Sequence, residues 1–92
     1  MIKSFAHKRL EKFFRTGSKA GIQPAHADKL ARQLAILNVA KAPAEMDKPG
    51  WRLHRLAGRD ARRWSVWVNG NWRLTFEFTG KDAAAVDYLD YH

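Results

Sequence analysis

The sequence has 92 residues, 46% of them hydrophobic and 12% aromatic, which suits one small domain over residues 1–92 with a modest core. It has no cysteine, which excludes disulfides, thiolate metal sites and a cysteine nucleophile. Its 17 Lys and Arg against 9 Asp and Glu give a formal net charge of +8, which favours a polyanionic partner, chiefly nucleic acid. No apolar run approaches 18 residues and the N-terminus lacks a signal-peptide core, so we expect a cytoplasmic protein without a membrane partner.

The N-terminal part predicts a short strand and a helix. Ile2–Phe5 is β-permissive and short, as an edge strand would be. From His7 to Thr16, apolar residues recur at helical spacing, and Gly17 is a plausible stop. The apolar positions of this helix are Leu10, Phe13 and Phe14.

A second helix is predicted after Pro24, which suits a first helical turn. One face is apolar over about four turns, and the other is polar. The expected buried face holds Ala27, Leu30, Ala31, Leu34 and Leu37, and the expected exposed face holds His26, Lys29, Arg32 and Gln33. Two prolines and a glycine in Lys41–Gly50 indicate a connector with at most one short turn.

Everything after Gly50 alternates as β-strands do. The runs that predict strands are Trp51–Leu56, Arg63–Val68, Asn71–Phe78 and Ala83–His92. Helices followed by strands predict an α+β fold in which two N-terminal helices pack on the apolar face of an antiparallel sheet. The predicted shared core is Leu10, Phe14, Leu30, Leu34, Leu37, Trp64, Val66, Leu74 and Phe76.

The sequence VNGNW sets the register of one hairpin. A two-residue Asn-Gly turn would pair Val66 with Arg73 and mix the apolar and polar faces. A three-residue connection, Asn69–Asn71, instead pairs Val66 with Leu74, and it also pairs Val68 with Trp72, Trp64 with Phe76, Trp67 with Arg73 and Ser65 with Thr75. The outer face then carries Arg52, His54, Trp67 and Arg73, residue types that RNA backbone and unstacked bases favour.

No phosphate-binding loop, dinucleotide fingerprint or metal-ligand spacing is present, and the four histidines are scattered, so we expect no metal and no cofactor. Cleavage of RNA needs only a base for the ribose 2′-OH, a cation for the phosphorane and an acid for the leaving 5′ oxygen. His54, Arg73 and the terminal Asp90, Tyr91 and His92 could supply these groups if the last strand pairs beside them.

Each of these residues also has a simpler interpretation as a surface residue. Strand alternation puts Asp90 and His92 on the side of Val86 and Tyr88, and Tyr91 with Leu89, so without a bulge the three terminal residues do not face one site. His7 and His26 lie on helices away from the polar face and are interpreted as structural. From spacing alone, the sequence favours a basic RNA-binding domain.

Four segments carry a resemblance to a known family: MIKSF at the start, RLHRLAG (Arg52–Gly58), RWSVWVNGNWRLTFEF (Arg63–Phe78) and VDYLDYH at the end. With them, the whole chain resembles the HigB toxins of the RelE superfamily. The resemblance implies a RelE-like, microbial-ribonuclease-like fold and a toxin that cuts mRNA in the ribosomal A site, without a metal. It also implies a cognate antitoxin with a helix-turn-helix region, through which the toxin would reach operator DNA.

The resemblance places His54, Arg73, Asp90, Tyr91 and His92 on positions that the family uses for cleavage. The remaining cations of this region and one aromatic residue are expected to bind RNA: Arg52, Arg55, Arg59, Arg62, Arg63 and Trp67.

One position departs from the family pattern. Ala57 stands in LAG where members often carry Lys. Arg55, Arg59, Arg62 or Arg63 could replace that cation, or the toxin could be weakened. The alternative to an mRNA endonuclease is therefore a non-catalytic RNA- or ribosome-binding domain.

Overall fold

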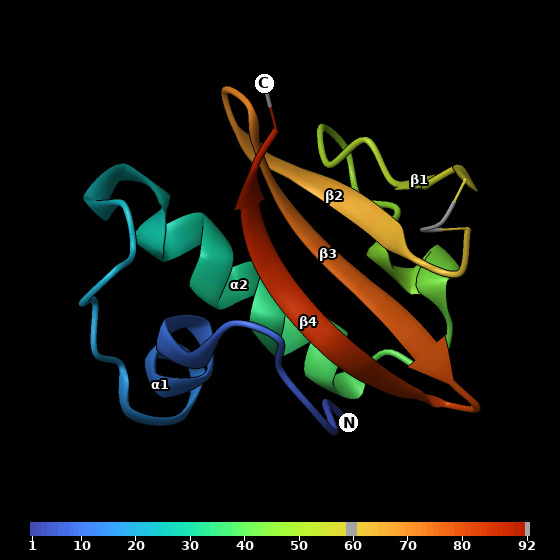
Figure 1. The fold of residues 1–92 in the computed structure, drawn as a ribbon, viewed down its shortest axis with the longest axis horizontal. Helices are drawn as coiled ribbons and strands as arrows, with labels where there is room; N and C mark the ends of the chain where they lie inside the picture. Colours follow the sequence, from blue (N-terminus) through green and yellow to red (C-terminus); the bar gives the residue numbers. More distant parts are fainter. Residues whose placement is uncertain (59–60, 92) are drawn as a thin grey trace.

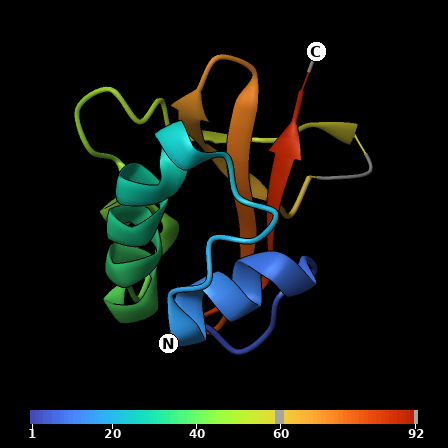
Figure 2. The ribbon, with the colours of Figure 1, turned by 90° about the vertical axis from the view of Figure 1, so that its left-hand side faces the viewer.

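The structure is a computed structural model, and it describes residues 1–58 and 61–91. It forms one four-stranded antiparallel sheet in the order β1-β2-β3-β4, with α2 behind the sheet in Figure 1 and beside it in Figure 2. The predicted α+β fold is confirmed. The elements are α1 (Lys8–Thr16), η1 (Pro24–His26), α2 (Ala27–Val39), η2 (Pro43–Met46), β1 (His54–Arg55), β2 (Trp64–Asn69), β3 (Trp72–Thr79) and β4 (Asp82–Asp90).

Local side chains set both ends of α1. His7 caps the N-terminus, where its Nδ1 accepts a hydrogen bond from the backbone N–H of Leu10 at 3.1 Å. Gly17 ends the helix in the left-handed region, with φ 79°, and its N–H donates to the carbonyl of Phe13. The predicted stop at Gly17 is confirmed.

The buried face of α2 differs from the predicted one in two ways. Leu30, Leu34 and Leu37 are fully buried as expected, but Ala31 is exposed and Gln33 is fully buried. The side-chain N–H of Gln33 donates to the carbonyl of Trp67 at 3.0 Å, which offsets part of the cost of burying this amide. Its Oε1 has no hydrogen-bond partner among the described residues. His26, also predicted to be exposed, is buried against Tyr88.

The β2–β3 hairpin combines a two-residue turn with a consistently apolar inner face. Its register pairs Trp64 with Phe76, Ser65 with Thr75, Val66 with Leu74 and Trp67 with Arg73, as predicted. The predicted pair of Val68 with Trp72 is wrong: Asn69 pairs with Trp72, and Val68 forms a bulge and stays buried. The turn itself is therefore the residue pair Gly70–Asn71, and the bulge restores the apolar face.

The predicted strand Trp51–Leu56 is much shorter in the structure, because only His54 and Arg55 pair with β2. Arg52 has φ 52°, in the left-handed region, and so interrupts the extended backbone. Trp51 is buried in the core instead of alternating on a strand face.

A second bulge lies in β4, where Ala85 has φ 50° and the register shifts opposite Thr75 and Glu77. Ala83 and Val86 are both buried across this bulge, and regular alternation resumes after it. The segment Ile2–Phe5 makes two parallel bridges to Ala83 and Val86 and forms no continuous strand, so it covers the β4 edge only in part.

The predicted core is confirmed for seven of its nine members, which are fully buried: Leu10, Leu30, Leu34, Leu37, Val66, Leu74 and Phe76. Phe14 and Trp64 are partly buried and pack against this core. In the described part of the chain, no helix is long and apolar enough to cross a membrane.

Candidate active site on the outer face of the sheet

The face of the sheet opposite α2 carries the polar side chains, arranged in two cross-strand rows. The register defines them: His54, Ser65, Thr75 and Asp87 form one row, and Trp67, Arg73 and Leu89 form the next. Residues two positions apart on a strand share a face, so the two rows are neighbours. This outer face therefore brings His54, Trp67 and Arg73 together, as the sequence predicts.

His54 is exposed, and its recorded contacts both use Nδ1. That atom lies 3.3 Å from the carbonyl oxygen of Arg52 and 3.3 Å from the hydroxyl of Ser65. A carbonyl only accepts hydrogen bonds, so the tautomer with the proton on Nδ1 satisfies this contact. That tautomer leaves the lone pair on Nε2 for a substrate, which is the arrangement a general base needs.

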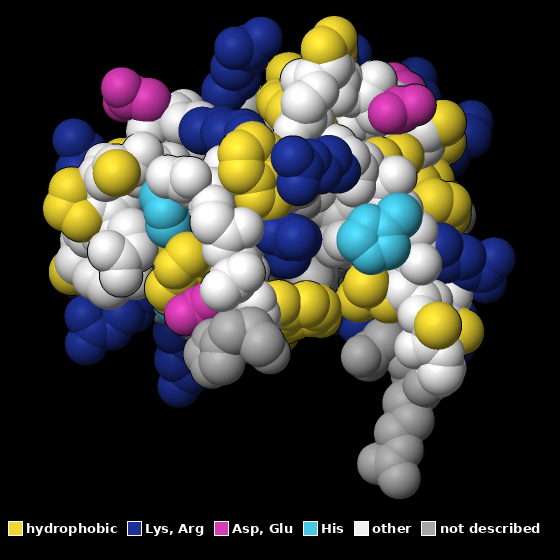
Figure 3. Space-filling view, turned by 90° about the horizontal axis from the view of Figure 1, so that it is seen from above, with side chains coloured by type: hydrophobic (Ala, Val, Ile, Leu, Met, Phe, Trp, Pro, Cys, Tyr) yellow, Lys and Arg dark blue, Asp and Glu magenta, His cyan; other side chains and the backbone are white. Residues whose placement is uncertain are grey.

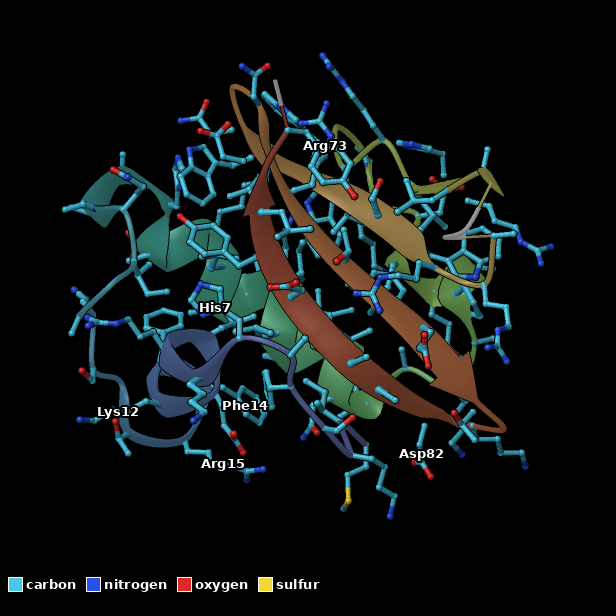
Figure 4. The ribbon with its side chains drawn as sticks, in the orientation of Figure 1. His7, Lys12, Phe14, Arg15, Arg73 and Asp82 are labelled. Carbon is cyan, nitrogen blue, oxygen red and sulfur yellow. The ribbon has the colours of Figure 1, made fainter. Side chains whose placement is uncertain are left out.

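Arg73 lies at the upper end of the sheet, close to the end of β4 (Figure 4). Its guanidinium donates to two backbone carbonyls, those of Gly70 at 3.3 Å and Trp72 at 3.2 Å. The indole N–H of Trp67 donates to the same carbonyl of Gly70 at 2.8 Å. The hairpin turn thus positions Arg73 without neutralising it, and its charge is available to a phosphate.

The C-terminal residues divide between the two faces. Asp90 pairs with Trp72 on the side of Tyr88 and α2, whereas Tyr91 follows Leu89 on the outer side and is 40% exposed. The backbone N–H of Tyr91 donates to the carbonyl of Asn71 at 2.7 Å. The β4 bulge precedes these residues, so it does not turn Asp90 to the outer face; His92 lies outside the described residues.

The other predicted RNA-binding arginines differ in their surroundings. Arg63 is 17% exposed, and its guanidinium contacts Thr75, the carbonyl of Ala85 and Glu77. Arg55 and Arg62 are exposed, and Arg55 donates to the carbonyl of Ala61. Arg59 lies outside the described residues. Arg63 is thus engaged in internal contacts, whereas Arg55 and Arg62 are accessible.

Positive charge gathers at this end of the molecule. Figure 3 looks onto the end that holds the β2–β3 hairpin and the C-terminus, where Lys and Arg side chains lie near the centre beside a histidine. They outnumber the acidic side chains in this view, which suits a surface that receives a polyanion.

Comparison with known proteins identifies the family of the chain. The sequence profile of the HigB-like toxins, described as RelE-like toxins of the type II toxin–antitoxin system HigB, matches residues 3–92. The chain belongs to this family. It is also 37% identical over 92 residues to a protein of Proteus vulgaris named endoribonuclease HigB, with 100% of both chains covered.

Two residues that contribute to the outer face of this HigB-like toxin, Asp87 and Lys29, were not predicted from the sequence. Asp87 is half-buried in the row of His54, and its Oδ1 accepts from the backbone N–H of Tyr88 at 2.8 Å. Alternation from Leu89 could have found it. Lys29 reaches Trp67 from α2, with Nζ 4.2 Å from the ring centroid, and no local sequence signal separates it from a solvated lysine.

The two remaining histidines of the toxin have structural contacts, as predicted. His7 caps α1, and His26 Nδ1 lies 2.6 Å from the hydroxyl of Tyr88. Burial and then the nearby Lys29 lower the pKa of His26, and burial raises the pKa of Tyr88. Among residues 1–58 and 61–91, no group of three or more His, Cys, Asp or Glu side chains could hold a metal ion.

Proposed function

We propose that this toxin is a ribosome-dependent endoribonuclease that cuts mRNA in the A site and so inhibits translation in the bacterial cytoplasm. The observation that carries the proposal is that an exposed His54 shares the outer face of the sheet with Arg73. Among the described residues, the hydrogen bonds of His54 use Nδ1, and those of the Arg73 guanidinium go to backbone carbonyls. The name of the Proteus vulgaris relative supports the activity. As a member of a type II toxin family, the chain has an RNA substrate and a cognate antitoxin as partners.

The proposed reaction needs no metal. His54 Nε2 takes the proton of the ribose 2′-OH, and the 2′ oxygen attacks the adjacent phosphorus. Arg73 stabilises the charge of the phosphorane with its fork of N–H donors. The bond from phosphorus to the 5′ oxygen then breaks, and that oxygen takes a proton from the terminal segment. The products are a 2′,3′-cyclic phosphate and a 5′-OH.

His92 is the proposed proton donor to the leaving oxygen. A protonated imidazole is a suitable donor to an oxygen that leaves as an alkoxide. Tyr91 shares the outer side of β4 and is the competing donor, and Asp90 is proposed to orient the segment from the other side.

The ribosome explains how a small domain reaches useful rates. A domain of 92 residues has little surface with which to hold a flexible strand, whereas the A site presents three nucleotides in a fixed geometry. The net charge of +8 then serves docking to ribosomal RNA. The antitoxin is proposed to carry a helix-turn-helix region, through which the complex would reach operator DNA.

A second function, a non-catalytic RNA- or ribosome-binding domain, is favoured by Ala57, an exposed residue at a position where the resemblance to the family leads us to expect Lys. Growth arrest by the expressed chain, with and without residue 92, separates the two functions. Loss of toxicity in the truncated chain, with ribosome binding and melting temperature retained, supports catalysis. Equal toxicity of both chains contradicts a catalytic role for His92 and favours the binding domain.

A further inference from the structure

Two cations from distant parts of the chain meet on one indole ring. Lys29 of α2 has its Nζ 4.2 Å from the ring centroid of Trp67, and the guanidinium carbon of Arg52 lies 4.7 Å from the same centroid. Cation–π attraction holds each of them at that position. Since both cations already occupy the ring, Trp67 fits a support for charged side chains better than an open platform for a nucleobase.

This arrangement is electrostatically costly as it stands. Burial and then the repulsion from Arg52 lower the pKa of Lys29. Arg52 is also held with a positive φ of 52°, a conformation that is uncommon for residues other than glycine. A bound anion would relieve the repulsion between the two cations.

No carboxylate relieves that repulsion in the described part of the chain. Ion pairs between described residues join Met1 to Asp82, Arg15 to Glu11, and Arg63 to Glu77, so Lys29, Arg32 and Arg52 take part in none. Their charges are therefore available to an external group.

A cleft adjoins the pair on the side of α2. Its volume is about 410 Å³, and Lys29 lines it as well as contacting Trp67. Arg32, one helical turn further along α2, adds a second cation, and Asp28 is the one carboxylate of the lining. The other lining residues are Pro49 and Trp51.

The cleft is connected to the candidate active site through β2. The backbone N–H of Trp67 donates to the carbonyl of Trp51 at 2.7 Å, which fixes the cleft wall against the strand. Trp67 in turn pairs with Arg73, and both side chains donate to Gly70. Cations from α2 and from the segment before β1 thus meet on the indole of Trp67, and Arg73 of β3 is the cross-strand partner of the same residue.

We propose that Lys29, Arg32 and Arg52 form a phosphate-binding subsite that holds an RNA phosphodiester outside the cleaved linkage. The subsite rests on the proposed function for its RNA ligand. Either the mRNA strand that flanks the cut or the ribosomal RNA around the A site can supply such a group, because both present the same chemistry.

The test replaces Lys29 by Met, which keeps the apolar stem on Trp67 and removes the charge. Lys12→Met is the matched control, because Lys12 is exposed on α1, away from Arg73 and the hairpin end of the sheet (Figure 4). Lys29→Arg, which keeps a cation on the ring, should restore binding. Melting temperatures identify any variant that fails to fold, and Arg32→Gln, at an exposed position, then tests the subsite without touching Trp67.

Two binding measurements distinguish the sources of the phosphate: a short single-stranded RNA with 2′-O-methyl riboses, and ribosomes without mRNA. We expect Lys29→Met to weaken binding to one of the two RNAs. The slope of the logarithm of its binding constant against the logarithm of the salt concentration should also become shallower, by about 0.7 to 1 per lost phosphate contact. Loss with the oligonucleotide assigns the subsite to mRNA, and loss with empty ribosomes assigns it to ribosomal RNA.

Equal binding of Lys29→Met and Lys12→Met to both RNAs would overturn the subsite. Cleavage by the unmodified chain on ribosomes carrying mRNA tells this failure from a failure of the proposed function. If the chain cuts but the two variants bind alike, only the subsite is wrong. If Lys29→Met alone loses RNA binding while the unmodified chain does not cut, the subsite stands and the nuclease proposal fails.

Discussion

Two arginines of the outer face, Arg63 and Arg73, have opposite surroundings. Arg63 lies near the β4 bulge, where Thr75 and the carbonyl of Ala85 each accept from it at 2.7 Å, and Glu77 lies 3.6 Å away. Arg73 lies at the hairpin end and contacts only carbonyls among the described residues. The first charge is used within the fold, and the second is left for a ligand.

The comparison shows why a count of arginines does not locate a binding site. Ala85 has a positive φ at the bulge, and its carbonyl turns out of the ladder toward Arg63. Arg63 therefore supplies a hydrogen-bond donor to a carbonyl at the bulge. At the hairpin end no such defect needs a cation, yet Arg73, Arg52 and Lys29 gather there.

Replacing Arg73 by Ala should have the largest effect on activity. If its charge stabilises the phosphorane, A-site cleavage should fall about 100- to 1000-fold. The melting temperature should change little, because the carbonyls that it contacts can be hydrated at the exposed turn. Cleavage assays on ribosomes carrying mRNA, with thermal denaturation of the same samples, measure both. Cleavage within a few fold of the unmodified chain would contradict the role of Arg73.

Replacing Arg63 by Ala should have the reverse profile. The carbonyl of Ala85 and the buried hydroxyl of Thr75 lose their donor, so the free energy of unfolding should fall by about 1 to 3 kcal/mol. Cleavage per folded molecule should stay within a few fold. Arg62→Ala, at an exposed neighbouring position, is the matched control for denaturant unfolding. Equal stability of the two variants would contradict the structural role of Arg63.

The same contrast separates the histidines and predicts a pH dependence of stability. Burial lowers the pKa of His26 in the folded state below its unfolded value, so the unfolded chain binds the proton first as the pH falls. The stabilisation is complete above the unfolded pKa and is lost as the pH falls through the folded one. Melting temperatures from pH 8 to pH 5 should fall more steeply for the unmodified chain than for His26→Gln. Equal slopes would show that His26 does not titrate between the two states.

Restoring Lys at Ala57 should have the smallest effect. If the family cation is missing there, Ala57→Lys should raise cleavage by up to about tenfold, because one added donor assists the same phosphate. Ala57→Gln is the matched control, with similar length and no charge. An unchanged rate for Ala57→Lys would mean that an arginine already fills the role or that the position has none.

Much of the fold follows from the sequence because one buried face constrains it. The pairs Val66 with Leu74 and Trp67 with Arg73 were predictable, since a register shifted by one residue would put Arg73 opposite Val66 on the buried face. The bulge at Val68 was not predictable, because it combines the two-residue turn at Gly70–Asn71 with an unbroken apolar face. Burial of Gln33 depends on a carbonyl that only the tertiary structure supplies.

The candidate site was predictable in part for the same reason. His54, Trp67 and Arg73 share a face by strand alternation, and alternation also separates Asp90 from Tyr91. Lys29 could not be found, because a lysine on the polar side of a helix gives no local sign that it meets an indole from a strand. Alternation in the sequence shows which side chains share a face of the sheet. It does not show which cations on that face have partners within the fold.

The chemistry of the cut ends is the most direct test of the proposed nuclease mechanism. The purified chain is mixed with ribosomes that carry an mRNA of known sequence and an empty A site, and the products are mapped by primer extension and analysed for their end groups. We expect one cut within the A-site codon that leaves a 2′,3′-cyclic phosphate and a 5′-OH, and we expect Arg73→Ala but not Arg63→Ala to lose this cut. Intact mRNA on ribosomes that have bound the chain, or ends with a 3′-OH and a 5′-phosphate, would contradict it.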